Sequence, residues 1–156
     1  MMKKKDIRPS LLDRLTNADN FKEGSRYYSI NELRHSVQTD LQYLLNTRVR
    51  FLSPDEECAE TQDTIVNFGL PDITTQSLVS EQGRRQFASW MERSIRRFEP
   101  RFKDVTVNVG GQFEKEEGLA FRIDAVLFAD PAPEDVAFDS TIDPISAMIA
   151  LKEVRR

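Results

Sequence analysis

The sequence has a single cysteine, Cys58, and a single histidine, His35, among its 156 residues. One cysteine excludes a disulfide within the chain and a cysteine-rich zinc site. One histidine excludes a histidine-cluster metal site and leaves little room for a histidine-based catalytic triad. The sequence also has no P-loop, no G-x-S-x-G and no G-x-G-x-x-G motif, and no pattern that pairs two carboxylates. We therefore expect no catalytic residues, no metal and no cofactor.

Long hydrophobic runs are also missing. No segment approaches the 18 apolar residues that a membrane-spanning helix needs. The basic residues 1–5 are not followed by the apolar stretch of a secretory signal. We expect a cytoplasmic protein that does not insert into a membrane. Its length and its 39% hydrophobic content fit one globular domain.

Charge is unevenly placed, although the net charge is only -4. A cluster of arginines lies between residues 84 and 101. On a helical projection, arginines fall on both sides of an apolar stripe, and some share their flank with glutamates. A protein that follows a nucleic-acid backbone needs an undiluted basic face. We therefore expect no nucleic-acid partner.

Three helices are predicted from caps and apolar spacing. Ser10 can cap a short helix over residues 11–15, with Asp13 in the position of a capping box. Ser29 and Glu32 form a second capping box, before leucines and a valine that recur at helical spacing up to position 45. Ser80 can cap a helix over residues 81–98, which Pro100 ends.

The C-terminal third changes to a period of two. Alternating apolar residues predict strands over 105–109, 119–127, 136–142 and 145–154, joined by short turns. Consecutive strands with short turns form antiparallel sheets. The predicted fold is α+β, with N-terminal helices packed on one face of a mostly antiparallel C-terminal sheet of about four strands.

The chain divides into two unequal parts. Residues 1–28 are predicted to form a flexible segment that carries a short docking helix, and residues 29–156 to form the single domain. Leu11, Leu12 and Leu15 give the short helix an apolar face. A helix this short is marginal alone, so it must dock either on its own domain or on a partner.

The turn Glu99-Pro100-Arg101 follows the arginine-rich helix. A glutamate at a helix C-terminus opposes the helix dipole, so Arg101 is expected to offset it. The pair is either an internal brace or a docking element for a partner's charges. We favour docking, because an exposed internal pair would contribute only about 0–1 kcal/mol.

Four motifs occur in the order and spacing of the TssE family, and the sequence therefore resembles these type VI secretion baseplate subunits. The TssE family is related to the phage T4 baseplate wedge protein. That wider family is sometimes labelled "lysozyme-like". The resemblance runs from Pro9 to about Val154. The motifs are Pro9-Ser10-Leu11-Leu12-Asp13-Arg14-Leu15, Asp40-Leu41 with Leu44-Leu45-Asn46-Thr47-Arg48, Asn67-Phe68-Gly69-Leu70-Pro71-Asp72 and Phe98-Glu99-Pro100-Arg101-Phe102.

The resemblance implies a structural, non-enzymatic protein that links the baseplate wedge to the contractile sheath. Its implied partners are TssF and TssG in the wedge, TssK nearby, and the sheath proteins TssB and TssC. Its implied place is the cytosolic face of the inner membrane. The family's Glu-Pro-Arg motif maps onto Glu99, Pro100 and Arg101. The alternatives are a cell-wall glycoside hydrolase, for which no carboxylate pair can be matched, and a phage-type tail protein.

Overall fold

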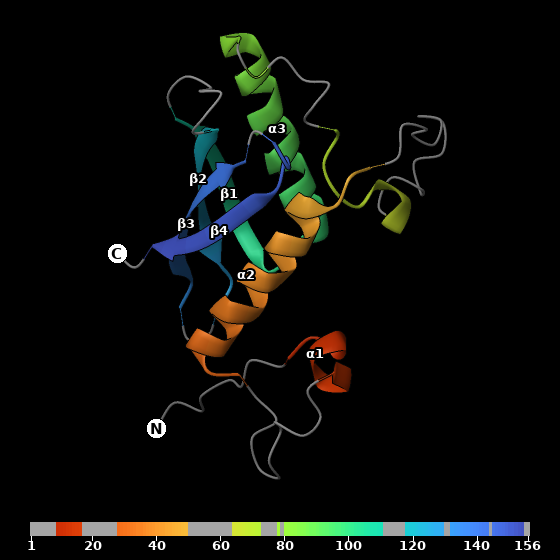
Figure 1. Ribbon diagram of the computed structural model, residues 1–156. Helices are drawn as coiled ribbons and strands as arrows, with labels where there is room; N and C mark the ends of the chain where they lie inside the picture. Colours follow the sequence, from red (N-terminus) through yellow and green to blue (C-terminus); the bar gives the residue numbers. More distant parts are fainter. Residues whose placement is uncertain are drawn as a thin grey trace.

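Two long helices lie against one face of a four-stranded antiparallel sheet (Figure 1). This arrangement confirms the predicted α+β class. The structure is a computed structural model that describes residues 9–16, 28–49, 64–72, 78, 80–110, 118–129, 132–143 and 145–154.

The helices begin where their caps predict. Helix α1 spans Leu11–Thr16, α2 spans Ile30–Asn46, and α3 spans Glu81–Phe98. Ser29 and Glu32 form the predicted capping box of α2, and the Ser80 side chain caps α3 by accepting from the backbone of Gly83. The single-turn 3-10 helix η3, Ile65–Asn67, lies between the two long helices in sequence.

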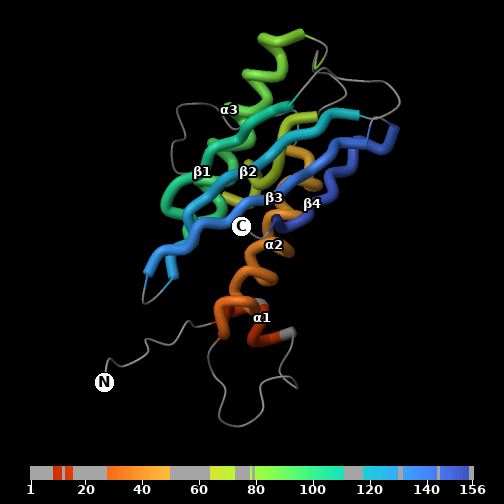
Figure 2. Tube along the Cα trace, turned by 90° about the vertical axis from the view of Figure 1, so that its left-hand side faces the viewer, coloured from red at the N-terminus to blue at the C-terminus, as the bar shows by residue number. Residues whose placement is uncertain are grey.

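The strands follow one another in the sheet in chain order (Figure 2). They are β1 (Phe102–Val109), β2 (Leu119–Leu127), β3 (Glu134–Ile142) and β4 (Ile149–Val154). Alternate residues of β2 are buried under the helices, as the period of two predicts.

The prediction that the fourth strand begins at residue 145 is wrong, because β4 begins at Ile149. The Asp143 carboxylate accepts hydrogen bonds from the backbone N–H groups of Ile145 and Ser146. These local bonds hold the chain in a turn. Ile145 therefore lies at the exposed turn and not in the sheet.

The outer edge of β4 is covered by amide side chains of α2. The Asn46 side chain accepts from the N–H of Ile149 at 2.8 Å and donates to the C=O of the same residue at 2.9 Å. Gln38 donates to the C=O of Leu151 at 3.0 Å. Helix α2 thus takes the place that a further strand would take at this edge.

The outer edge of β1 is covered in the same way by α3. Arg96 donates to the C=O of Val105 at 2.7 Å, and Glu92 accepts from the N–H of Val107 at 2.8 Å. Each long helix therefore satisfies backbone groups at one edge of the sheet as well as packing on its face.

The segment 64–72 is a strap between α2 and α3. Leu70 is fully buried, and its N–H donates to the C=O of Thr47. Phe68 packs edge-on against Phe98, with ring centroids 5.3 Å apart. Gly69 adopts a φ of +125°, and a Cβ there would lie 2.4 Å from the Thr47 oxygen. The segment is therefore an ordered turn that Phe68 and Leu70 anchor to the domain.

Candidate partner-docking site

Glu99 and Arg101 form a two-point ion pair at the junction of α3 and β1. The Nε of Arg101 donates to Oε1 of Glu99 at 2.6 Å, and its Nη2 donates to Oε2. The backbone N–H of Arg101 also donates to Oε1 at 3.2 Å. This is the strong, planar geometry that arginine makes with a carboxylate. The expectation that Arg101 offsets the charge of Glu99 is confirmed.

The pair is less exposed than the sequence suggested. Glu99 is only 3% exposed, whereas Pro100 points to solvent. A buried carboxylate that loses its partner is costly. Glu99 therefore contributes to folding stability whether or not a partner also uses the corner.

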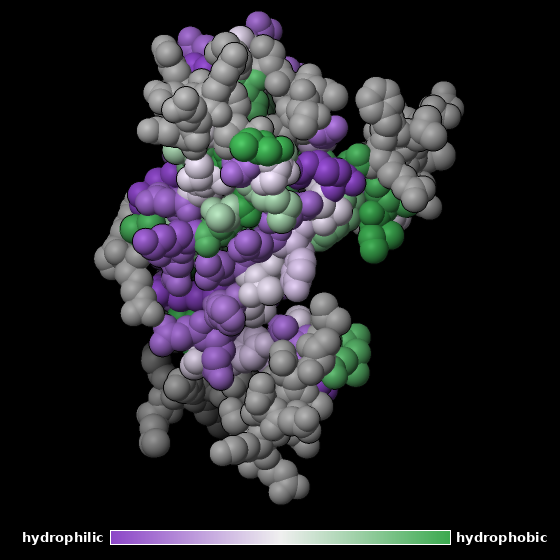
Figure 3. Space-filling model, in the orientation of Figure 1, coloured by the Kyte–Doolittle hydropathy of each residue, from purple (hydrophilic) through white to green (hydrophobic). Residues whose placement is uncertain are grey.

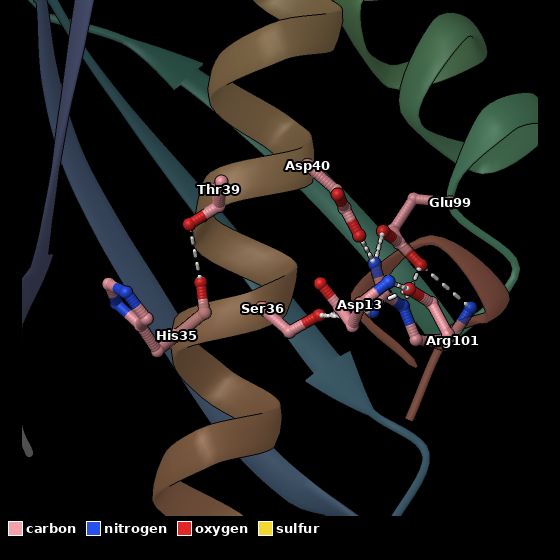
Figure 4. A network of polar contacts seen from close by, with 8 residues as sticks. Asp13, His35, Ser36, Thr39, Asp40, Glu99 and Arg101 are labelled. Carbon is pink, nitrogen blue, oxygen red and sulfur yellow. Dashed lines mark hydrogen bonds and ion pairs between the residues drawn. The ribbon is translucent and has the colours of Figure 1, made fainter. Parts of the chain in front are cut away.

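Arg101 also reaches across to α2 (Figure 4). It donates to the Ser36 hydroxyl at 3.1 Å and to the carboxylate of Asp40. Burial alone would lower the pKa of Arg101, but its contacts with Glu99 and Asp40 raise it above its ordinary value. One guanidinium thus joins α2, the end of α3 and the start of β1.

Helix α1 is attached to the same network through Asp13. Its carboxylate accepts from the hydroxyls of Ser10, at 2.7 Å, and Ser36, at 2.9 Å. Partial burial opposes its ionisation, but hydrogen bonds from Ser10, Ser36 and Tyr28 hold the pKa of Asp13 below its ordinary value. Burial and the bond to Asp13 raise the pKa of Tyr28 to about 12.

The predicted cap of α1 is present, since the Ser10 hydroxyl accepts from the backbone N–H of Asp13. Leu11 is 69% exposed and Leu15 is 70% exposed. The side chain of Leu12 lies outside the described residues. The sequence left open whether α1 docks on its own domain or on a partner. In the structure, α1 contacts its own domain through Asp13, and its Leu11 and Leu15 side chains face solvent.

Ser36 and Asp40 were missed as site residues. They lie three and seven positions after Leu33, so both fall on the arc of α2 that carries buried leucines. A serine and an aspartate on the apolar arc of a helix need hydrogen-bond or ion-pair partners. This pattern could have identified Ser36 and Asp40 from the sequence. The identity of those partners, Asp13 and Arg101, depends on tertiary contacts.

A groove of about 670 Å³ lies beside this network. Its walls come from the start of α1, the middle of α2, the strap and the end of α3. In Figure 3, a hollow over α2 lies between hydrophobic surface at α1 and at η3. The lining residues are Ser10, Tyr28, Leu33, Asp40, Leu41, Tyr43, Leu44, Phe68, Phe98, Glu99, Pro100 and Arg101.

Within the described part of the chain, no three histidine, cysteine, aspartate or glutamate side chains are placed to hold a metal ion. His35 lies on the exposed side of α2, as its position on the helix predicts. No helix within the described ranges is long and apolar enough to cross a bilayer.

These features define a class of protein: a small α+β scaffold whose distinctive site is a groove with an internal charge network. The chain also matches a known family over residues 31–132, described as baseplate wedge protein gp25. Because the match covers well over half of the sequence, the chain belongs to the baseplate wedge protein gp25 family. The resemblance seen in the sequence is confirmed at this level.

The family match includes α2, the strap, α3 and the Glu99–Arg101 corner, and it ends before β3. Helix α1 lies outside it. No match was found among curated proteins or among solved structures. As a member of this family, the protein is a structural baseplate component that works with other baseplate components.

Proposed function

We propose that the protein is a TssE-type subunit of a type VI secretion baseplate. It joins the wedge to the first ring of the contractile sheath and helps to initiate sheath assembly, without enzymatic activity. Family membership supports the baseplate part of this proposal. The N-terminal motif, Pro9–Leu15, favours the secretion branch because that motif carries the resemblance to TssE.

The observation that carries the proposal is the form of α1. Asp13 attaches the helix to the domain, while Leu11 and Leu15 stay exposed beside the groove. An anchored helix that turns its leucines outward gains little within the monomer. Exposed apolar surface of this kind marks protein-protein contact. We assign Leu11, Leu12, Leu15, Glu99, Pro100 and Arg101 to one partner-docking surface.

The partners proposed for this surface are the wedge proteins TssF and TssG, with TssK nearby and the sheath proteins TssB and TssC as the next layer. The proposed location is the cytosolic face of the inner membrane. We propose no nucleic-acid partner, no cofactor and no insertion into the membrane.

The test is a double variant, Leu11→Ser with Leu15→Ser, assayed for capture of co-expressed TssF and TssG. We expect capture to fall at least tenfold while the melting temperature changes little, because both side chains are exposed. The matched control is Ile145→Ser, at an apolar side chain that is 94% exposed in the β3–β4 turn. Equal capture by both variants would refute the assignment of α1.

A phage-type tail baseplate protein is the second candidate, since the family description fits it equally. Co-purification with TssB–TssC sheath, or its absence, separates the two. For the glycoside hydrolase alternative, no feature of the described residues offers support. Peptidoglycan turnover that disappears on substitution of one carboxylate would reinstate it.

A further inference from the structure

The groove beside the Glu99–Arg101 corner is open and apolar although the network at its rim is full of charge. Of the eight large hydrophobic side chains that are exposed in the described residues, five belong to the elements around this groove. They are Leu11, Leu15, Tyr43, Ile65 and Val66. An apolar floor with exposed apolar side chains on the elements around it is suited to a partner's side chains more than to water.

The walls of the groove decide the form of the partner. They come mostly from helical elements, the strap and the corner turn, and none of the described lining residues belongs to a strand of the sheet. The outer edges of β1 and β4 carry helix side chains on their backbone groups instead. A partner in the groove would therefore not extend this sheet by adding a strand. A helix that lays apolar side chains into the groove fits this geometry.

The charge at the rim decides the chemistry of that helix. Three carboxylates, those of Asp13, Asp40 and Glu99, lie around one guanidinium, that of Arg101. Three formal negative charges against one positive charge leave an excess of two. Asp40 is the most accessible of the carboxylates in direct contact with Arg101, with 37% of its side chain exposed, and it lines the groove. A basic side chain that enters beside Asp40 would meet this excess.

We propose that the groove receives an amphipathic helix of a partner protein, which places apolar side chains on the floor and one lysine or arginine beside Asp40. This inference deepens the proposed function, because it rests on the same docking surface and specifies what docks there. The pairing of opposite charges then fixes the position of the helix along the groove.

The first test is affinity for co-expressed TssF–TssG, measured with Asp40→Asn. The variant keeps the side-chain shape and an oxygen that can accept from Arg101. We expect binding to weaken about tenfold or more, and the wild-type affinity to fall with added salt. The matched control is Asp139→Asn, at an exposed carboxylate on the open sheet face that pairs with Arg122. Equal affinity for both variants would overturn the proposal.

The second test reads the occupant directly and does not require the partner to be a secretion protein. The photoreactive p-benzoylphenylalanine replaces Tyr43 at the groove rim, or Thr106 on the open sheet face, in native cells. We expect position 43 to label a helical, basic peptide. Labelling of an acidic or extended peptide, of the chain itself or a second copy, or of nothing would overturn the proposal. If TssF–TssG fail to bind while a basic helix of another protein is labelled, only the proposed function fails.

Discussion

The edges of the sheet and the corner at Glu99–Arg101 use similar side chains with different results. At the edges, Asn46 and Glu92 bind backbone groups, so the helices close the sheet. At the corner, Arg101 binds the carboxylates of Glu99 and Asp40, Asp13 joins the network through Ser36, and an apolar groove lies beside them. Polar contacts thus cover the edges of the sheet, whereas at the corner they leave the groove accessible. The closed part protects the fold, and the open part is where we place the partner.

The strap that forms one wall of the groove gives the largest expected effect. Gly69→Ala should destabilise the protein by more than about 3 kcal/mol, because an alanine would be strained at φ +125° and its Cβ would meet the Thr47 oxygen. Chemical denaturation measures this. Gly110→Ala at the end of β1 is the control, because a Cβ there lies 3.6 Å from the Ala120 oxygen. Similar losses of unfolding free energy in the two variants would show that the backbone at Gly69 does not require glycine.

Removal of Glu99 tests the internal part of the corner. Glu99→Ala should cost about 2–3 kcal/mol, since it removes the two-point partner of Arg101 in a partly buried place and leaves the guanidinium with Asp40 and the Ser36 hydroxyl. The control is Arg122→Ala, which removes two solvent-accessible ion pairs on the open sheet face, with Asp124 and Asp139, and should leave the denaturation midpoint almost unchanged. A midpoint for Glu99→Ala equal to that of the control would show that the corner serves docking alone.

Removing the side chain that covers the β4 edge should reduce stability less than removing Glu99. Asn46→Ala leaves both outer backbone groups of Ile149 without their side-chain partner, at a cost of about 1–2 kcal/mol. It should also increase self-association of the protein, seen by sedimentation. Gln42→Ala, one turn earlier on the exposed side of α2, is the control. If the Asn46→Ala protein stays monomeric at high concentration, Asn46 does not protect the β4 edge from self-association.

A buried serine gives a test of opposite sign. The hydroxyl of Ser140 is buried on β3 and has no hydrogen-bond partner in the described structure. Ser140→Ala removes this unsatisfied group, so the protein should gain about 0.5–1 kcal/mol. A loss of stability in thermal melts would reveal a partner for the hydroxyl.

The attachment of α1 should respond to pH. The pKa of Asp13 is lowered in the fold, so its contribution is present above the ordinary pKa of 3.8 and is lost as the pH falls through the lowered value. The pKa of Tyr28 is raised to about 12, so its contribution is present below pH 10 and is lost as the pH rises toward 12. Absorbance titration of the wild type against Tyr28→Phe should show phenolate forming near pH 12. A normal titration would mean that α1 is not attached.

The sequence predicted the features that depend on near neighbours. The starts of α2 and α3 follow from Ser29 and Ser80, because a cap is a contact over three residues. The partners of Arg101 and Asn46 could not be predicted, since Asp40 is 61 residues from Arg101 and Ile149 is 103 residues from Asn46. Only the packed fold brings these groups together.

The position of Arg101 also has a mechanical consequence. Its guanidinium binds α2 and the end of α3, its backbone leads into β1, and its C=O accepts from the N–H of Phe128 after β2 at 2.7 Å. A force applied at the groove is therefore transmitted to β1 and β2 through the bonds of Arg101, without passing along a flexible loop. In a machine that contracts, this short route would let the subunit transmit load between neighbours as a stiff coupling.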